Sequence, residues 1–384
     1  MKIKLRQAFD LQMGKTPARN RSDYWNGDHK WISIADIGNA GKFLTKTKES
    51  ITAAGIDGSG IKVVPQGTVI MSFKLSIGKT AITSEDMYTN EAIMAFIDNG
   101  KFAVDTNYLY HLCCGTNWTA GTNKAVMGLT LNKATLLEKE IPLPDINEQH
   151  EIATKLDKID ALIAERQQQL ELIDQAVKSR FIELFGDIVL NPFGWEKDYL
   201  GVVCDVRDGT HDSPHYHSTG FPLVTSKNVT GGEIDLTDCS LISEADFNKI
   251  NERSKVDMGD IIMPMIGTVG KPVIVNIKPN FAIKNVSLIK FKDDSRVLNT
   301  FIRSLLQSDY FDDAVLSKVR GGTQKFISLG DIRKLVVIVP PMELQEQFAA
   351  FVEQTDKSKY YKSIQILKII TEAIAKEVSH DRIR

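Results

Sequence analysis

The chain has 384 residues, of which 42% are hydrophobic and 25% are charged. One hydrophobic core rarely serves a chain of this length, so we expect more than one domain, each with the composition of an ordinary globular protein. The net charge of -2 at pH 7 excludes a generally basic protein that coats nucleic acid. Any contact with nucleic acid must therefore come from local basic residues or from another subunit.

The sequence contains no apolar run long enough for a signal peptide or a membrane-spanning helix. Its four cysteines form no C-x-x-C pair and no metal-ligand spacing: Cys113, Cys114, Cys204 and Cys239. Reduced thiols are typical of the cytosol, so we expect a cytoplasmic protein that makes no membrane contact.

Two β-prone stretches open the two halves of the chain. They are "WISIADIGNAGKF", residues 31–43, and "FPLVTSKNVTGGEI", residues 221–234. Each is closed by a glycine turn, which predicts short strand-like pieces at the start of each half.

A longer stretch then recurs at a constant offset of 192 residues. The stretch "VPQGTVIMSFKLSIGKTAI", residues 64–82, is similar to "VDMGDIIMPMIGTVGKPVI", residues 256–274. The ending "GKT" is typical of a phosphate-binding loop, but Phe73 occupies the position where such a loop needs glycine. Thr80, the residue that would hold Mg²⁺, has the counterpart Pro272, which carries no hydroxyl group. The repeat therefore predicts a strand, a glycine turn and a second strand, used twice.

The elements that follow are also paired between the halves. "NEAIMAF" and "NVSLIKF" are apolar strand candidates, whereas "TNYLYHL" and "NTFIRSLLQ" have the amphipathic pattern of short helices. Near the end of each half comes a short polar loop, "GTNK" at 121–124 and "GTQK" at 322–325. Amide and cationic side chains are the types that contact base edges, although four such residues also suit a plain surface turn.

Each half ends in a long helix that follows prolines. The first is predicted over Asn147–Phe185, with Asp145 and Glu148 as a capping pair, and the second follows Pro340 and Pro341. Steps of four and three along the first helix give a mainly apolar seam: Ile152, Leu156, Ile159, Ile163, Arg166, Leu170, Ile173, Val177, Arg180 and Leu184. The seam of the second helix is more polar in its middle. Such seams predict two helices packed on each other as an antiparallel coiled coil.

The expected fold class is therefore α+β, with two similar mixed domains separated by two long helices in an internal pseudo-twofold repeat. We expect a first globular domain over 1–144 and a first helix over 145–186. A second globular domain is expected over 187–341, and a second helix over 342–384.

This order of domains and helices resembles the specificity (S) subunit of type I restriction-modification systems. The resemblance is carried by "LPDINEQHEIA" with "VPPMELQEQFA", by the duplicated glycine stretches, and by "FGDIVLNPFGWE" at the passage into the second half. It covers essentially the whole chain. In that family, two target recognition domains each read one half of a split double-stranded DNA site. The helices set the distance between the half-sites and dock two methyltransferase subunits.

The resemblance implies a non-catalytic subunit without a cofactor, whose partners are methyltransferase (M) subunits and restriction or translocase (R) subunits. Three other motifs have residues typical of active sites but lack the full pattern of one. "NPFG", residues 191–194, lacks the second proline of an adenine methyltransferase loop and reads as a turn. "THDSPHYH", residues 210–217, lacks a fourth ligand at zinc spacing, and His111 beside Cys113 lies in an apolar stretch typical of a core.

The candidate DNA contacts are loop residues with amide, hydroxyl or cationic side chains. They are Lys15, Thr16, Arg19, Arg21, Asn123 and Lys124 in the first half, and Arg207, Thr210, His211, Asn228, Arg320, Thr323, Gln324 and Lys325 in the second. Two alternatives remain open. One is a stand-alone enzyme that uses a nucleotide or S-adenosylmethionine through Lys79 or Asn191, and the other is a coiled-coil scaffold that binds no DNA.

Overall fold

The computed structural model describes all residues except 75, 120–130, 267–268, 293, 316–325 and 382–384. The chain divides into two compact units, Met1–Ile163 and Ala164–Arg384. Among the described residues, no helix is both long and apolar enough to cross a bilayer.

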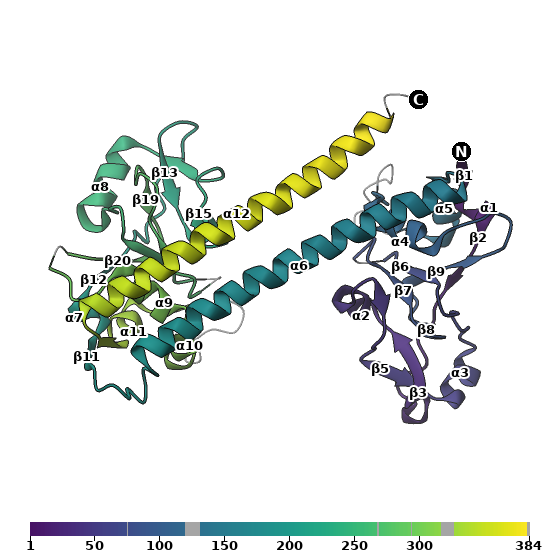
Figure 1. Ribbon diagram of the computed structural model, residues 1–384, viewed down its shortest axis with the longest axis horizontal. Helices are drawn as coiled ribbons and strands as arrows, with labels where there is room; N and C mark the ends of the chain where they lie inside the picture. The colour runs from purple at the N-terminus through teal and green to yellow at the C-terminus, as the bar shows by residue number, and fades with distance from the viewer. Residues whose placement is uncertain (75, 120–130, 267–268, 293, 316–325, 382–384) are drawn as a thin grey trace. The chain divides into compact units, whose positions relative to one another are not determined.

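The first unit is built on a five-stranded sheet (Figure 1). Its order is β2 (Phe9–Met13), β9 (Ile93–Asp98), β6 (Val69–Ser72), β7 (Thr80–Thr83) and β4 (Phe43–Leu44). All neighbours are antiparallel except β4 and β7. A second sheet has the order β5 (Glu49–Ile51), β3 (Trp25–Ile32) and β8 (Tyr88–Thr89), and β1 (Lys2–Lys4) pairs with β10 (Glu140–Pro142).

The "GKT" motif, residues 78–80, lies at the end of the turn between β6 and β7. Gly78 has φ +91°, a backbone conformation that favours glycine, and its N–H donates to the carbonyl of Ser72 at 2.9 Å. After Lys79 the chain continues as a strand, whereas a phosphate-binding loop leads into a helix whose N-terminus faces the phosphate. The predicted strand, glycine turn and strand are confirmed here.

Short helices complete the first unit. They are α1 (Leu5–Ala8), the 3-10 helix η1 (Ser22–Tyr24), α2 (Ile34–Asn39), α3 (Ala53–Ser59), α4 (Thr106–Gly115) and α5 (Lys133–Leu137). The prediction of strand-like pieces throughout 31–43 was wrong in its middle, which forms α2. Ser33 caps this helix, and the Asp36 carboxylate accepts a hydrogen bond from the Ser33 N–H at 2.8 Å. This reciprocal cap outweighs the β-prone composition.

The sheets of the second unit resemble those of the first, although among the described residues its main sheet has four strands and not five. Its main sheet is β12 (Asp205–Asp208), β20 (Val286–Lys290), β17 (Ile261–Pro264) and β18 (Val273–Ile274). A three-stranded sheet has the order β16 (Ser240–Ile242), β13 (Phe221–Val224) and β19 (Ala282–Ile283). Two further pairs are β11 (Glu196–Tyr199) with β21 (Val336–Val339) and β14 (Val229–Thr230) with β15 (Glu233–Ile234).

The helices of the second unit also follow the first. They are α7 (Leu200–Val203), the 3-10 helix η2 (Ser226–Asn228), α8 (Glu244–Ser254), α9 (Asn299–Leu306), α10 (Asp309–Ala314) and α11 (Leu329–Arg333). The helix α4 packs on β6 and β7 of its sheet, and α9 packs on β18 of its own. The strand and helix predictions for 90–96, 106–112, 285–291 and 299–307 are thus confirmed.

Two long helices close the units, α6 (Ile146–Phe185) and α12 (Met342–Asp381). The Asp145 carboxylate caps α6 by accepting from the N–H groups of Asn147 at 3.0 Å and Glu148 at 3.1 Å. At the other end, Gly186 has φ +76° and its N–H donates to the Ile182 carbonyl at 2.8 Å. The predicted extent of α6 is correct to one residue.

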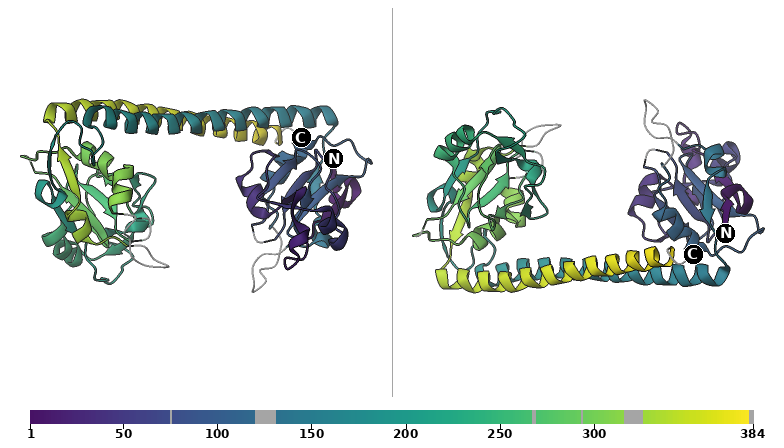
Figure 2. Two further views of the ribbon diagram at one scale, coloured as in Figure 1. Left: turned by 90° about the horizontal axis from the view of Figure 1, so that it is seen from below. Right: turned by 90° about the horizontal axis from the view of Figure 1, so that it is seen from above.

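Within the second unit, the end of α6 and the start of α12 lie side by side (Figure 2). The rings of Phe181 and Phe348 have centroids 5.5 Å apart, and farther along, Lys359 forms an ion pair with Asp174. As the residue number rises in α12 it falls in α6, so these segments run antiparallel. All ten predicted seam positions of α6 are half-buried.

The "NPFG" motif forms the turn after α6, as predicted. Asn191 has φ +47°, and its side-chain oxygen accepts from the Trp195 N–H at 2.9 Å while its amide donates to the Trp195 carbonyl at 2.8 Å. This side chain holds its own loop closed.

Candidate nucleic-acid interface

The loop after β2 carries the first group of predicted DNA contacts. The Lys15 ammonium donates to the Ser59 carbonyl at 3.2 Å, and the Thr16 hydroxyl bonds to the Glu91 carboxylate. The Lys15 carbonyl in turn accepts from the indole N–H of buried Trp31 at 3.0 Å. The loop is therefore tied to α3, to β3 and to the connection between β8 and β9.

Arg19 lies flat on an aromatic surface in this loop. Its guanidinium carbon is 3.9 Å from the ring centroid of Trp25, and both terminal nitrogens face the Glu49 carboxylate, one of them at 3.1 Å. Arg19 holds the pKa of Glu49 below its usual range through this hydrogen bond. The side chain is still 53% exposed. A guanidinium held in this way presents its outer face to solvent, but its charge is shared with a carboxylate.

Arg21 is paired locally. It forms two hydrogen bonds with Asp23, at 2.9 and 2.7 Å, and its guanidinium carbon is 4.6 Å from the ring centroid of Tyr24. This pair is solvent-exposed, so a phosphate could compete for Arg21 at little cost.

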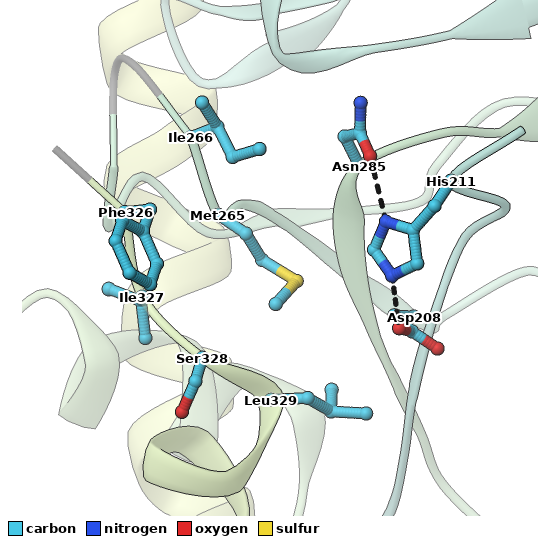
Figure 3. Close-up of a pocket in the computed structure, with 9 residues that line it drawn as sticks. All are labelled: Asp208, His211, Met265, Ile266, Asn285, Phe326, Ile327, Ser328 and Leu329. Atoms are coloured by element: carbon cyan, nitrogen blue, oxygen red, sulfur yellow. Dashed lines mark hydrogen bonds and ion pairs between the residues drawn. The ribbon is translucent and has the colours of Figure 1, made fainter. Parts of the chain in front are cut away.

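In the second unit, His211 lies in a pocket of about 330 Å³ (Figure 3). Its Nδ1 is 2.9 Å from the side-chain oxygen of Asn285, and its Nε2 is 2.8 Å from the Asp208 carboxylate. Asp208 is nearly buried and also pairs with Arg253. These contacts, with that to Asn285 the largest, raise the pKa of His211. The facing wall holds Met265, Ile266 and the residues from Phe326 to Leu329.

The pocket combines one polar corner with an apolar wall. Phe326 pairs with Ile266 in an isolated antiparallel bridge and remains 44% exposed. Thr210, next to His211, lies in a parallel bridge with Lys284, and its hydroxyl accepts from the Asp212 N–H at 3.1 Å. This arrangement suits contact with a planar polar group such as a base edge.

Two other predicted contacts in the second unit have partners within the fold. Arg207 bonds to the Asp205 carboxylate at 2.9 Å and to the Arg253 carbonyl at 2.8 Å. Asn228 is buried, and its side-chain oxygen accepts from the N–H and the hydroxyl of Thr225, both at 3.0 Å. These side chains are engaged in holding β12 and the turn after β13.

The remaining predicted contacts lie outside the described residues: Asn123, Lys124, Arg320, Thr323, Gln324 and Lys325. The first two follow Trp118, which is buried and donates its indole N–H to the Cys113 carbonyl at 2.8 Å. The other four precede Phe326 in the sequence, and Phe326 lines the pocket.

The structure places further residues, not predicted as DNA contacts from the sequence, next to Arg19 and His211. They are Trp25, Trp31 and Glu49 around Arg19, and Asp208, Asn285 and Phe326 around His211. Asp208 lies three residues before His211, so its sequence spacing could have indicated it. Trp25 and Trp31 follow Arg19 in the next strand, β3, whereas Glu49, Asn285 and Phe326 come from distant parts of the chain and give no local signal.

The motifs weighed as enzymatic sites have structural roles. The ring of His111 faces Asp157 of α6 at 2.7 Å, and Cys113 is buried in the core, which raises the pKa of its thiol. Such a thiol is a poor nucleophile. In the part of the chain that the structure describes, no group of three or more His, Cys, Asp or Glu side chains surrounds a possible metal position.

Comparison with known proteins decides the family. The model of the type I restriction modification DNA specificity domain matches residues 1–173 and 192–371. The chain belongs to this family. The expected resemblance is thereby confirmed, and the chain is a DNA-recognition component rather than a catalytic one.

Specificity subunits of other type I restriction enzymes are similar to this chain. The type I restriction enzyme MjaIX specificity subunit of Methanocaldococcus jannaschii is 26% identical, over 99% of this chain and 93% of the relative. The EcoprrI specificity subunit of Escherichia coli is 25% identical over 56% of each chain.

Two solved structures share the fold. One, described as the structural basis of complex assembly and conformational transition of the type I R-M system, has a TM-score of 0.58 at 18% identity and covers 98% of this chain and 95% of its own. The S subunit from M. genitalium has a TM-score of 0.50 at 14% identity and covers 98% of this chain and 94% of its own.

Proposed function

We propose that this specificity subunit selects a split double-stranded DNA site, with one globular domain reading each half. The domains would comprise residues 1–144 and 187–341, and the long helices 145–186 and 342–384. The observation that carries the proposal is the duplication: two units whose main sheets share a similar order of four strands, each followed by a long helix. A protein with two copies of one reading domain suits a site with two separated halves.

The two long helices would pack antiparallel along their seams and set the distance between the half-sites. The contacts between the end of α6 and the start of α12 support this arrangement. The same helices would dock two methyltransferase subunits. Restriction subunits would then join the resulting complex.

Each domain would contact DNA through its loops. In the first domain we propose Lys15, Thr16, Arg19 and Arg21 with Asn123 and Lys124. In the second we propose Thr210 and His211 at the pocket, with Arg320, Thr323, Gln324 and Lys325. Arg207 and Asn228 would support the domain instead, because their side chains are engaged within it. Arginine and amide side chains suit base edges and phosphates alike.

The test is to co-express the chain with a type I methyltransferase subunit, purify the complex, and select bound sequences from a random DNA library. We expect a stable complex that enriches two short half-sites with a fixed gap. A complex that enriches no sequence would favour the scaffold alternative. Tight binding of ATP or S-adenosylmethionine by the chain alone would favour the stand-alone enzyme.

A further inference from the structure

One buried glutamine stands at the same place in both long helices. Gln149 is the fourth residue of α6 and Gln345 is the fourth residue of α12. Both have 0% exposure. A fully buried amide needs hydrogen-bond partners for two donors and one acceptor, so its surroundings show what it holds.

In the first unit, the Gln149 amide makes three hydrogen bonds. Its Nε2 donates to the Pro144 carbonyl at 2.9 Å and to the Ala103 carbonyl at 3.0 Å. Its Oε1 accepts from the Asp105 N–H at 2.9 Å. Asp105 is the N-cap residue of α4 and accepts from the Tyr108 N–H at 2.7 Å. The side chain thus ties the start of α6 to the start of α4.

In the second unit, Gln345 makes the corresponding three bonds. Its Nε2 donates to the Pro340 carbonyl at 2.8 Å and to the Arg296 carbonyl at 3.0 Å. Its Oε1 accepts from the N–H of Leu298 at 2.8 Å, and Leu298 is the N-cap residue of α9. We call this set of three hydrogen bonds the clamp. The clamp of the second unit joins the start of α12 to the start of α9.

A second contact follows about two to three turns along each long helix. In the first unit, His111 of α4 faces Asp157 of α6 at 2.7 Å. In the second, Arg303 of α9 pairs with Asp356 of α12 at 3.4 Å. Since α4 and α9 pack on the sheets of their units, each long helix is held to its domain at two separate points. Two points fix a direction.

We propose that Gln149 and Gln345 are positioning residues that set the direction in which each long helix leaves its domain, and thereby the preferred gap between the DNA half-sites. This inference rests on the proposed function. A change of about 10° at the base of a helix about 60 Å long displaces its far end sideways by about 10 Å. A loosened clamp therefore lets the two DNA-reading domains take a wider range of relative positions, and the preference for one gap weakens.

The experiment uses the full chain in complex with its methyltransferase partner and measures binding to sites whose gap varies one base pair at a time. Gln149→Met keeps the length of the side chain but removes both donors and the acceptor. We expect the preference for the parent gap over its neighbours to fall by about threefold or more, while the selected half-site sequences stay the same. Gln345→Met should do likewise.

A matched control separates positioning from stability. Leu136 lies in the buried core of the first unit, so Leu136→Val should lower thermal stability while leaving the three partners of Gln149 in place. It should keep the parent gap profile. If Gln149→Met does not fold, Gln345→Met and the milder Gln149→Asn measure the same quantity.

The outcomes are distinguishable. If the parent complex prefers one gap sharply and the folded Gln149 and Gln345 variants keep that preference unchanged, the clamp proposal is wrong and the proposed function stands. A parent complex with no preferred gap would overturn the proposed function and the clamp with it.

Discussion

At the scale of single residues, His211 is a side chain whose protonation the fold favours. Both of its ring nitrogens face acceptors, Asn285 Oδ1 and a carboxylate oxygen of Asp208. Only the doubly protonated ring can donate to both, which is why its pKa is raised in spite of the nearby Arg253.

This predicts a pH-dependent stability. Because the folded pKa is raised above the unfolded value of about 6.5, the stabilisation is fully present below that pH and is lost as pH rises through the folded pKa. His211→Gln should therefore lower the urea midpoint of unfolding more at pH 5.5 than at pH 8.5. Identical pH profiles for the two proteins would contradict the role of this ring.

Arg19 gives a second prediction at this scale, because Glu49 occupies the guanidinium edge that a phosphate would need. Glu49→Gln should strengthen DNA binding several-fold and steepen the dependence of log K on log salt by about one unit. Arg19→Ala should do the opposite. Titration of the purified complex with labelled DNA at several salt concentrations measures the affinity and its salt dependence. Unchanged slopes in the two variants would show that Arg19 does not contact the DNA.

These residues also show the limit of prediction from sequence. Cationic and hydroxyl side chains in loops can be found in the chain, but their partners cannot: Glu49 lies 30 residues from Arg19, and the carbonyl that Gln149 holds lies 46 residues away. A backbone carbonyl carries no sequence signal. Asn228 lies in a predicted loop, and the sequence gives no sign that the fold places Thr225 against it and buries it.

At the scale of elements, periodic and duplicated patterns were the most reliable guides. The half-buried stripe of α6 follows its ten predicted seam positions, and both glycine turns lie between the predicted strands. Helix α2 was missed because a six-residue helix is too short for its periodicity to compete with β-prone neighbours, and its cap was the deciding signal.

The long helices lead to a prediction about distance. Removing one heptad from each, Ala164–Leu170 and Tyr360–Ile366, keeps the phase of the seam and shortens a paired rod by about 10 Å. This length corresponds to about three base pairs. Removing three base pairs from the gap also rotates one half-site by about 100° around the DNA axis. We expect the preferred gap to shrink by about one to three base pairs, with weaker binding, because the DNA must twist to compensate.

Selection from a library of variable gaps measures the change. Circular dichroism and co-purification with the methyltransferase subunit establish that the shortened chain folds and assembles. If it does both and still prefers the parent gap, the helices do not set the distance.

At the scale of the whole molecule, the duplication was predictable because the two copies preserve turn glycines and apolar strands at nearly constant offsets. The family followed from the order of these paired motifs, and the match over residues 1–173 and 192–371 confirms it. The bases read by each domain were not predictable, since base recognition depends on how a few loop side chains are oriented and not on the repeat that carries them.

The measurement that tests the central claim most directly compares matched alanine substitutions in the two domains. One variant replaces Asn123 and Lys124, and the other replaces Thr323, Gln324 and Lys325. Each complex is then titrated with DNA carrying mutations in either half of the selected site. If each base contact contributes about 1–3 kcal/mol, the first variant should lose discrimination in one half only, and the second in the other half only. Equal loss of discrimination in both halves from either variant would contradict the assignment of one domain to each half-site.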